Sequence, residues 1–204
     1  SETGFMQYYK ANQLGEVQLA SSAFGQAMAI TPLQMCTAVA AAVNGGYLVT
    51  PHVVDKITDA NGNVIEEIGA NVRRQVISES TSNVIRQIME YEVGAGTGGG
   101  KYAYVSGYRI GGKSGTSEQL NMDRRADGDY KKVASFAAVL PADDPEIIVY
   151  VMLDDPNNAR TDYSSLLAAP VVGNIISEIA PYLGIAADGE DRSQTVVTVP
   201  NLVG

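Results

Sequence analysis

Residues 108–118 read YRIGGKSGTSE, and this stretch places two hydroxyl side chains, a cation and glycines in one short segment. If the segment is a β-strand, Ser114 and Thr116 point to the same side, so both hydroxyls can face one groove. Gly115 lets a ligand approach the backbone closely, and Lys113 adds positive charge beside an incoming carboxylate. The alternative is an ordinary exposed strand end, because a four-residue match also arises by chance.

The segments around this motif predict strands packed against helices. We expect the motif strand to cover residues 102–116, and apolar runs at 133–140 and 146–153 indicate two further strands. A helix of about residues 166–182 follows, with apolar residues at helical spacing. The last two strands are almost wholly apolar, so we expect both faces of the sheet to be covered. The order predicts an α+β fold, with an antiparallel sheet flanked by helices.

Signals nearer the N-terminus predict two more helices and a β-hairpin. Residues 1–25 are polar and interrupted by glycines, so we expect them to be irregular. Thr31 and Gln34 have the spacing of a capping box and predict the start of a helix. Residues 49–57 predict a strand, and Asn61-Gly62 predicts a tight hairpin turn before the apolar residues 64–65. Ser78 is a candidate cap for a second helix.

The chain is acidic, with 14 Lys and Arg against 23 Asp and Glu and a net charge of −9. Phosphate contacts need clustered cations, so we do not expect nucleic acid as a partner. The charge is uneven, because residues 101–132 hold seven cations and four acids, a net charge of +3. A local positive field favours an anionic ligand there. The alternative is a solvated loop.

The single cysteine, Cys36, and the single histidine, His52, limit the chemistry of the chain. One cysteine excludes an intrachain disulfide and a cysteine metal cluster, and one histidine cannot form a zinc site by itself.

The glycine-rich residues 94–100 do not have a lysine at the position that a phosphate-binding loop requires, and no strand directly precedes them. We therefore expect a flexible connection. The sequence therefore implies neither a metal nor a cofactor. It also has no apolar run of about 18 residues that predicts a membrane span.

The motif at Lys113 resembles the third signature of penicillin-binding proteins and serine β-lactamases, Lys-[Thr/Ser]-Gly on a strand. Together with FGQAMAITPLQ at residues 24–34, it is similar to class B high-molecular-weight transpeptidases of the cell-division and spore-cortex type. The last residues, VTVPNLVG at 197–204, resemble the opening of a PASTA repeat, a small wall-binding module. The resemblance covers nearly the whole chain and implies a partial penicillin-binding transpeptidase fold, which is serine β-lactamase-like.

Two signatures of that family are missing from the chain. No serine has a lysine three positions on, and no serine or tyrosine has an asparagine two positions on. Both signatures lie upstream in such proteins, so the chain resembles the C-terminal part of a transpeptidase domain. On this interpretation residues 1–184 belong to the transpeptidase domain, residues 185–194 form an acidic linker and residues 195–204 begin a PASTA-like module.

The resemblance implies that the parent protein is a peptidoglycan D,D-transpeptidase. In this family a serine attacks the penultimate D-Ala carbonyl of a stem peptide, D-Ala leaves, and an amine of a neighbouring stem resolves the acyl-enzyme. Lys113, Ser114 and Thr116 would bind the terminal carboxylate of the stem peptide or the carboxylate of a β-lactam. The backbone N–H of Thr116 would be one of two oxyanion-hole donors. Without the nucleophile, this chain alone is predicted to be inactive.

Glu118 lies two residues beyond Thr116 and is predicted to point to the same side of the strand. A carboxylate at this position would oppose an anionic ligand and partly cancel the charge of Lys113. The alternative is that Glu118 is neutralised locally by an ion pair with Arg124 or Arg125.

The partners that the resemblance implies are a stem peptide ending in D-Ala-D-Ala, β-lactam antibiotics and the upstream half of the same domain. The implied location is the extracytoplasmic face of the membrane in a Gram-positive bacterium, with an upstream transmembrane helix as anchor. Two other functions stay open. One is a non-catalytic penicillin-sensing or cell-wall-binding module, and the other is a structural part that serves only contacts within the division machinery.

Overall fold

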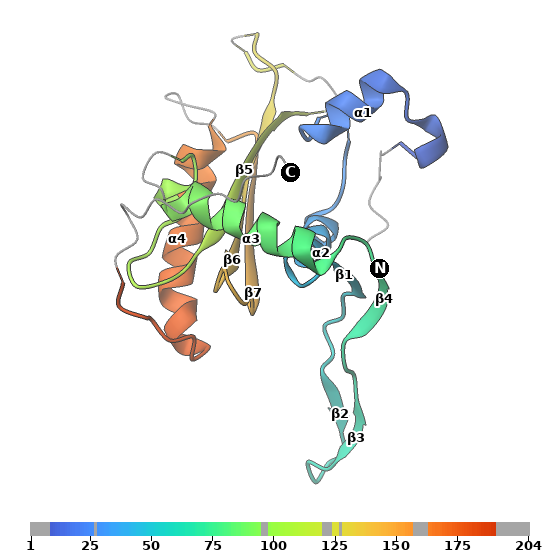
Figure 1. Ribbon diagram of the computed structural model, residues 1–204, viewed down its shortest axis with the longest axis vertical. Helices are drawn as coiled ribbons and strands as arrows, with labels where there is room; N and C mark the ends of the chain where they lie inside the picture. Colours follow the sequence, from blue (N-terminus) through green and yellow to red (C-terminus); the bar gives the residue numbers. More distant parts are fainter. Residues whose placement is uncertain are drawn as a thin grey trace.

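The structure is a computed structural model that describes residues 9–26, 28–94, 98–119, 124–126, 128–156 and 163–190. Within these residues a three-stranded antiparallel sheet has helices on both faces, and a narrow β-arm projects from the body (Figure 1). The predicted α+β fold, with an antiparallel sheet flanked by helices, is confirmed.

The main sheet has the order β5 (Gly111–Glu118), β6 (Lys132–Leu140) and β7 (Ile147–Asp154), so the motif strand β5 is an edge strand. The second and third predicted strands are confirmed. The predicted start of the first strand at residue 102 is wrong. Lys101–Ala103 instead form the 3-10 helix η2, and the chain then turns at Gly107 with a φ of +82° before β5 begins.

The main hydrophobic core lies between this sheet and α4 (Ser164–Tyr182). Phe136 of β6 and Val172 and Ile176 of α4 are fully buried there. On the opposite face a smaller cluster around Val139 joins the sheet to α2 and α3. Met152 on that face of β7 is 43% exposed. The expectation of two covered faces therefore holds for β6 but not for β7.

Helix α4 is 19 residues long and is, by length and composition alone, apolar enough to cross a membrane. It confirms the helix predicted at about residues 166–182, and its sequence is not one continuous apolar run, because Asn174 and Glu178 interrupt the apolar residues. Its residues Ala168, Val172 and Ile176 are fully buried against the sheet. These contacts are those of a core helix.

Both helices predicted from capping residues are confirmed. Helix α2 (Pro32–Val43) is capped by Thr31, whose Oγ1 accepts a hydrogen bond from the Gln34 N–H at 3.3 Å. In return, Gln34 Oε1 accepts one from the Thr31 N–H at 2.9 Å, which completes the capping box. Before helix α3 (Glu79–Gly94), Ser78 Oγ accepts a hydrogen bond from the Thr81 N–H at 3.1 Å.

The prediction that residues 1–25 are irregular is wrong for the part that the structure describes. That part contains the 3-10 helix η1 (Ala11–Gln13) and the helix α1 (Glu16–Ala23). No residue of α1 is buried, and Val17 and Leu19 are 75% and 60% exposed. The helix therefore has no buried face, which explains why an amphipathic pattern did not predict it.

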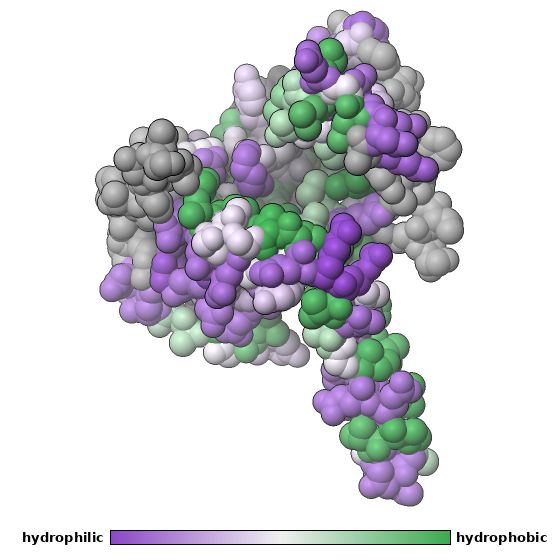
Figure 2. Space-filling view, turned by 45° about the vertical axis from the view of Figure 1, so that its right-hand side comes forward, coloured by the Kyte–Doolittle hydropathy of each residue, from purple (hydrophilic) through white to green (hydrophobic). Residues whose placement is uncertain are grey.

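The projecting arm consists of two short antiparallel ladders (Figure 1). In one, β1 (Tyr47–Thr50) pairs with β4 (Asn71–Gln75), and in the other, β2 (Lys56–Thr58) pairs with β3 (Val64–Glu67). The predicted hairpin around Asn61-Gly62 is confirmed by the pairing of β2 with β3. The prediction of one continuous strand over 49–57 is wrong, because Pro51 has no N–H and interrupts the pairing. Apolar and polar side chains alternate along the arm (Figure 2), and Val53 and Ile65 are among its exposed apolar residues.

The segment after α4 returns to the body of the domain. Ile185 is buried, the Asp188 N–H donates to the Gly107 carbonyl at 2.9 Å, and the Gly107 N–H donates to the Glu190 carbonyl at 3.3 Å. The described part of the predicted acidic linker at 185–194 is thus attached to the turn that precedes β5. Residues 195–204, the predicted start of a PASTA-like module, lie outside the described residues.

Candidate functional site

The site is built on β5, where the pairing register assigns each side chain of the motif to a face. Ser114 is directly opposite Phe136, which is buried against α4, so Ser114 and Thr116 both point to the α4 side of the sheet. Lys113 and Gly115 belong to the opposite side. The two hydroxyls therefore share one face, but Lys113 does not. A ligand that lies along the free edge of β5 can contact side chains from both faces.

The backbone of β5 also alternates between its two edges. The Gly115 carbonyl points inward and accepts a hydrogen bond from Ser135 Oγ of β6 at 3.4 Å. The Ser114 and Thr116 carbonyls point outward, since they accept hydrogen bonds from Lys113 Nζ at 2.7 Å and from Gln26 Nε2 at 3.3 Å. In an antiparallel strand the N–H of a residue points to the same edge as its carbonyl.

The Thr116 N–H is therefore directed to the outer edge of β5. No strand of the described residues pairs along that edge, since the sheet ends at β5. A backbone donor in this position is available to an oxygen atom of a ligand.

The Thr116 side chain has a partner that the sequence did not predict. Thr116 Oγ1 donates a hydrogen bond to Ser164 Oγ at 3.1 Å and accepts one from the Ser164 N–H at 3.3 Å. Ser164 is 3% exposed and is the first residue of α4. The two residues are 48 positions apart, and no local pattern connects them.

The glycine-rich turn before β5 approaches the motif closely. A Cβ atom at Gly99 would lie 3.8 Å from Ser114 Oγ, and one at Gly98 would lie 2.1 Å from the Glu92 carbonyl oxygen. Residue 98 therefore has to be glycine because of its close approach to the Glu92 backbone, whereas the expected flexible connection gave no packing reason for a glycine there. Residues 95–97 of this connection lie outside the described residues.

Glu118 is exposed at the end of β5, and the register places it opposite Lys132. Among the described residues it forms no ion pair or side-chain hydrogen bond. Arg125 binds Asp155 at 2.7 Å, and the Arg124 guanidinium lies 3.9 Å from the centre of the Tyr130 ring. The alternative in which Arg124 or Arg125 neutralises Glu118 is not the arrangement in this structure.

Other groups with potential chemistry lie away from β5. Within the described ranges, no group of three or more His, Cys, Asp or Glu side chains is placed to hold a metal ion. Cys36 lies in α2, and partial burial raises the pKa of its thiol. His52 is exposed beside the arm, with Nδ1 3.4 Å from the Thr50 carbonyl oxygen.

The chain matches the family model of the penicillin binding protein transpeptidase domain over residues 2–177, so it belongs to this family. It is 36% identical over 204 residues to stage V sporulation protein D of Bacillus subtilis, a match that covers 96% of this chain and 31% of that protein. It is also 34% identical over 192 residues to a probable peptidoglycan D,D-transpeptidase FtsI of Caulobacter vibrioides, covering 90% and 30%. The chain thus spans about a third of the length of these relatives.

Solved structures agree with this assignment. Penicillin-binding protein 3 of Mycobacterium tuberculosis, solved in complex with ampicillin, has a TM-score of 0.73 and 25% identity, covering 94% of this chain and 43% of that one. The transpeptidase domain of Burkholderia pseudomallei penicillin-binding protein 3 has a TM-score of 0.72 and 25% identity, covering 90% and 51%. The resemblance to class B penicillin-binding transpeptidases is confirmed.

Proposed function

We propose that this chain is the part of a peptidoglycan D,D-transpeptidase that holds the substrate, while the nucleophilic serine comes from the upstream half of the same domain. The observation that carries the proposal is the outward direction of the Thr116 backbone on an edge strand, beside Lys113 and Ser114. This chain spans about a third of the length of its relatives, which leaves room in such proteins for a nucleophile outside the matched part.

The substrate in this proposal is a stem peptide ending in D-Ala-D-Ala, which lies as an extended segment along the free edge of β5. The serine oxygen bonds to the penultimate D-Ala carbonyl carbon, and the carbonyl oxygen becomes an oxyanion. The Thr116 N–H donates to that oxyanion, and Gly115 lets the substrate backbone come close. The peptide bond then breaks, terminal D-Ala leaves with a proton on its amine, and an amine of a second stem resolves the acyl-enzyme. A β-lactam follows the same first step.

Ser114, Thr116 and Lys113 bind the terminal carboxylate in this proposal. Thr116 Oγ1 is already hydrogen-bonded to Ser164, so it would turn from Ser164 Oγ to the incoming carboxylate while still accepting from the Ser164 N–H. The exposed Lys113 would exchange its bond to the Ser114 carbonyl for the anion. Glu118 has no ion-pair partner among the described residues, so its charge would oppose the same anion.

The upstream half of the domain is proposed to cover α1 and the segment that follows it. Val17, Leu19 and Phe24 are 75%, 60% and 71% exposed, which is a large apolar surface for so short a stretch. Gln26, at the end of the stretch, already contacts β5 through the Thr116 carbonyl. The proposed location is the extracytoplasmic face of the membrane of a Gram-positive bacterium, with an upstream transmembrane anchor.

The test is acylation of the full-length protein that contains this chain. Benzylpenicillin should add one covalent adduct, seen by intact-mass measurement, and Lys113→Ala should slow its formation. A full-length protein that binds penicillin but releases no D-Ala from a D-Ala-D-Ala stem peptide would favour the sensing or wall-binding alternative. Normal wall synthesis after bulky substitutions at Ser114 and Thr116 would favour a purely structural role.

A further inference from the structure

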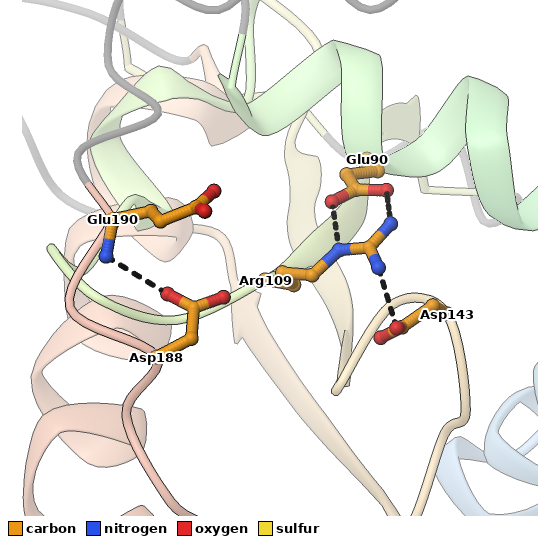
Figure 3. Close-up of polar contacts among 5 residues, drawn as sticks. All are labelled: Glu90, Arg109, Asp143, Asp188 and Glu190. Atoms are coloured by element: carbon orange, nitrogen blue, oxygen red, sulfur yellow. Dashed lines mark hydrogen bonds and ion pairs between the residues drawn. The ribbon is translucent and has the colours of Figure 1, made fainter.

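The Arg109 side chain connects the N-terminal end of β5 to α3 and to the turn between β6 and β7 (Figure 3). Its Nε and Nη2 atoms donate to the two carboxylate oxygens of Glu90 on α3, both at 2.7 Å. Its Nη1 donates to Asp143, in the turn between β6 and β7. Arg109 itself lies two residues before β5 begins.

Glu90 is a buried charge that depends on this partner. The side chain of Glu90 is 10% exposed, and both of its oxygens accept hydrogen bonds from Arg109. The pKa of Arg109 is raised, chiefly by hydrogen bonding to Glu90, with burial acting in the opposite direction. A two-point pair between planar groups fixes both their distance and their orientation.

The packing beside this pair explains why a directional contact matters. Helix α3 approaches β5 at Gly111 and Gly112, which have no side chains to interlock with it. A Cβ atom at Gly111 would lie 3.1 Å from Met89 Cβ, and one at Gly112 would lie 2.9 Å from a methyl group of Val93. Backbone-to-helix contacts of this kind limit the separation of α3 and β5 but resist sliding along the strand only weakly.

The position of α3 in turn determines what lies over the motif. Helix α3 ends at Gly94 and leads to the turn at Gly98–Gly100, in which Gly99 approaches Ser114 Oγ. Arg109 is four residues from Lys113, roughly 13 Å along an extended strand, so it does not touch a ligand there. Its influence on the motif has to pass through the backbone of β5 and through α3.

The segment after α4 also contacts the residues just before β5. Gly107, two residues before Arg109, is hydrogen-bonded to Asp188 and Glu190. A cavity of about 190 Å³ lies beside the guanidinium and includes Asp143 and Asp188 in its lining. The residues just before β5 are therefore attached to α3, to the β6–β7 turn and to the segment after α4.

We propose that Arg109 is a positioning residue for the motif strand: its two-point pair with Glu90 sets the register between α3 and β5. This inference rests on the proposed function, because it assigns Arg109 to the efficiency of acylation. The pair holds the Thr116 N–H and the Gly98–Gly100 turn at the positions that the substrate requires. A misplacement of about 1 Å far from the reacting atoms can cost about 10²-fold in rate.

The experiment compares four variants of the full-length protein: Arg109→Lys, Arg109→Gln, Glu90→Gln and, as a control, Ile176→Ala. Lysine keeps the charge but cannot form the two-point pair. Ile176 is buried between α4 and the sheet, so its truncation lowers stability without touching Arg109. All rate constants for acylation by benzylpenicillin are measured well below the melting temperature of each variant.

Loss of positioning should slow acylation at least about tenfold in the glutamine variants, with Arg109→Lys also slow despite its retained charge. Ile176→Ala should lose stability but stay within about twofold of the parent rate. Equal rate losses in Ile176→Ala and in the Arg109 variants at matched stability would overturn the proposal, as would parent-like rates in all of the Arg109 and Glu90 variants.

Hydrogen exchange on the same proteins gives a readout that does not require acylation. The Arg109 variants should speed exchange in residues 98–100 and 111–118 more than Ile176→Ala does. Unchanged exchange there would overturn the positioning role. If the parent protein forms no acyl adduct but shows the predicted exchange pattern, the proposed function fails while the positioning of β5 by Arg109 stands.

Discussion

Thr116 Oγ1 lies 3.1 Å from Ser164 Oγ and donates a hydrogen bond to it, which ties the motif strand to the first turn of α4. Ser164 is almost fully buried, so this bond satisfies a polar group that water does not reach. The same hydroxyl is proposed to bind substrate. Thr116 therefore has a structural contact with α4, and the proposed function adds a ligand-binding role.

Substitutions at the two ends of this bond should separate those roles. Thr116→Val should cost about 1–3 kcal/mol of unfolding free energy, because Ser164 loses a buried partner, and it should also slow acylation by carboxylated β-lactams. Ser164→Ala should lower stability by a similar amount but leave acylation near the parent rate, because the Thr116 hydroxyl remains. Urea denaturation and acylation kinetics measure the two effects. Equal slowing by both variants would contradict the ligand-binding role.

The two hydroxyls of the motif should act together on an anionic ligand. The double variant Ser114→Ala/Thr116→Ala should slow acylation by a carboxylated β-lactam, because two hydrogen bonds to a charge are worth about 1.5–3 kcal/mol each. The double-variant loss should differ from the sum of the single losses, since both bonds involve one carboxylate. A stopped-flow measurement of all three variants checks this. An unchanged acylation rate in the double variant would remove both residues from the site.

Glu118 should tune the affinity for anionic ligands through charge alone. Glu118→Gln in the full-length protein should acylate faster with an anionic β-lactam, because it removes a carboxylate that has no ion-pair partner among the described residues. The gain should shrink as salt rises, since Glu118 is exposed and its interaction with the anion is screened. Lys132→Gln, which changes the residue opposite Glu118, provides a matched control and should not accelerate acylation. Equal or slower acylation by Glu118→Gln at low salt would contradict this role.

The 204-residue chain alone should form no covalent adduct with penicillin, because it contains no Ser-x-x-Lys. Intact-mass measurement after incubation with a fluorescent penicillin checks this, with the full-length protein as the positive control. A stable one-to-one acyl adduct on the isolated chain would show that another serine in it is the nucleophile.

Two glycines with positive φ should differ in their tolerance of alanine. Gly46 has a φ of +92°, and a Cβ atom there would lie 2.0 Å from the Ile77 carbonyl oxygen, so Gly46→Ala should cost more than about 3 kcal/mol. Gly62 has a φ of +86° but open space around it, so Gly62→Ala should cost only about 1–2 kcal/mol. Chemical denaturation of both variants compares them. Similar losses would mean that backbone strain, not the close approach to Ile77, requires Gly46.

The sequence alone was sufficient wherever the signal is local. Thr31 and Gln34 predict the start of α2 because a capping box needs only residues three positions apart. The apolar runs at β6 and β7 predict strands because they are short and contain β-branched residues, and in β6 burial on both faces accounts for the continuous pattern. The motif at Lys113–Thr116, together with residues 24–34, indicated the family because each stretch is a run of consecutive residues. None of these features depends on the path of the rest of the chain.

Tertiary structure decided the features that depend on contacts between distant residues. The outward direction of the Thr116 carbonyl is visible only through Gln26, 90 positions away, and the partner of its hydroxyl is Ser164, 48 positions away. Likewise Glu90 and Arg109 pair because α3 packs against the N-terminal end of β5. The face on which each motif side chain lies follows from the register with β6. A register is set by packing over the whole sheet, and a one-residue shift would reverse every face, so no short stretch of sequence specifies it.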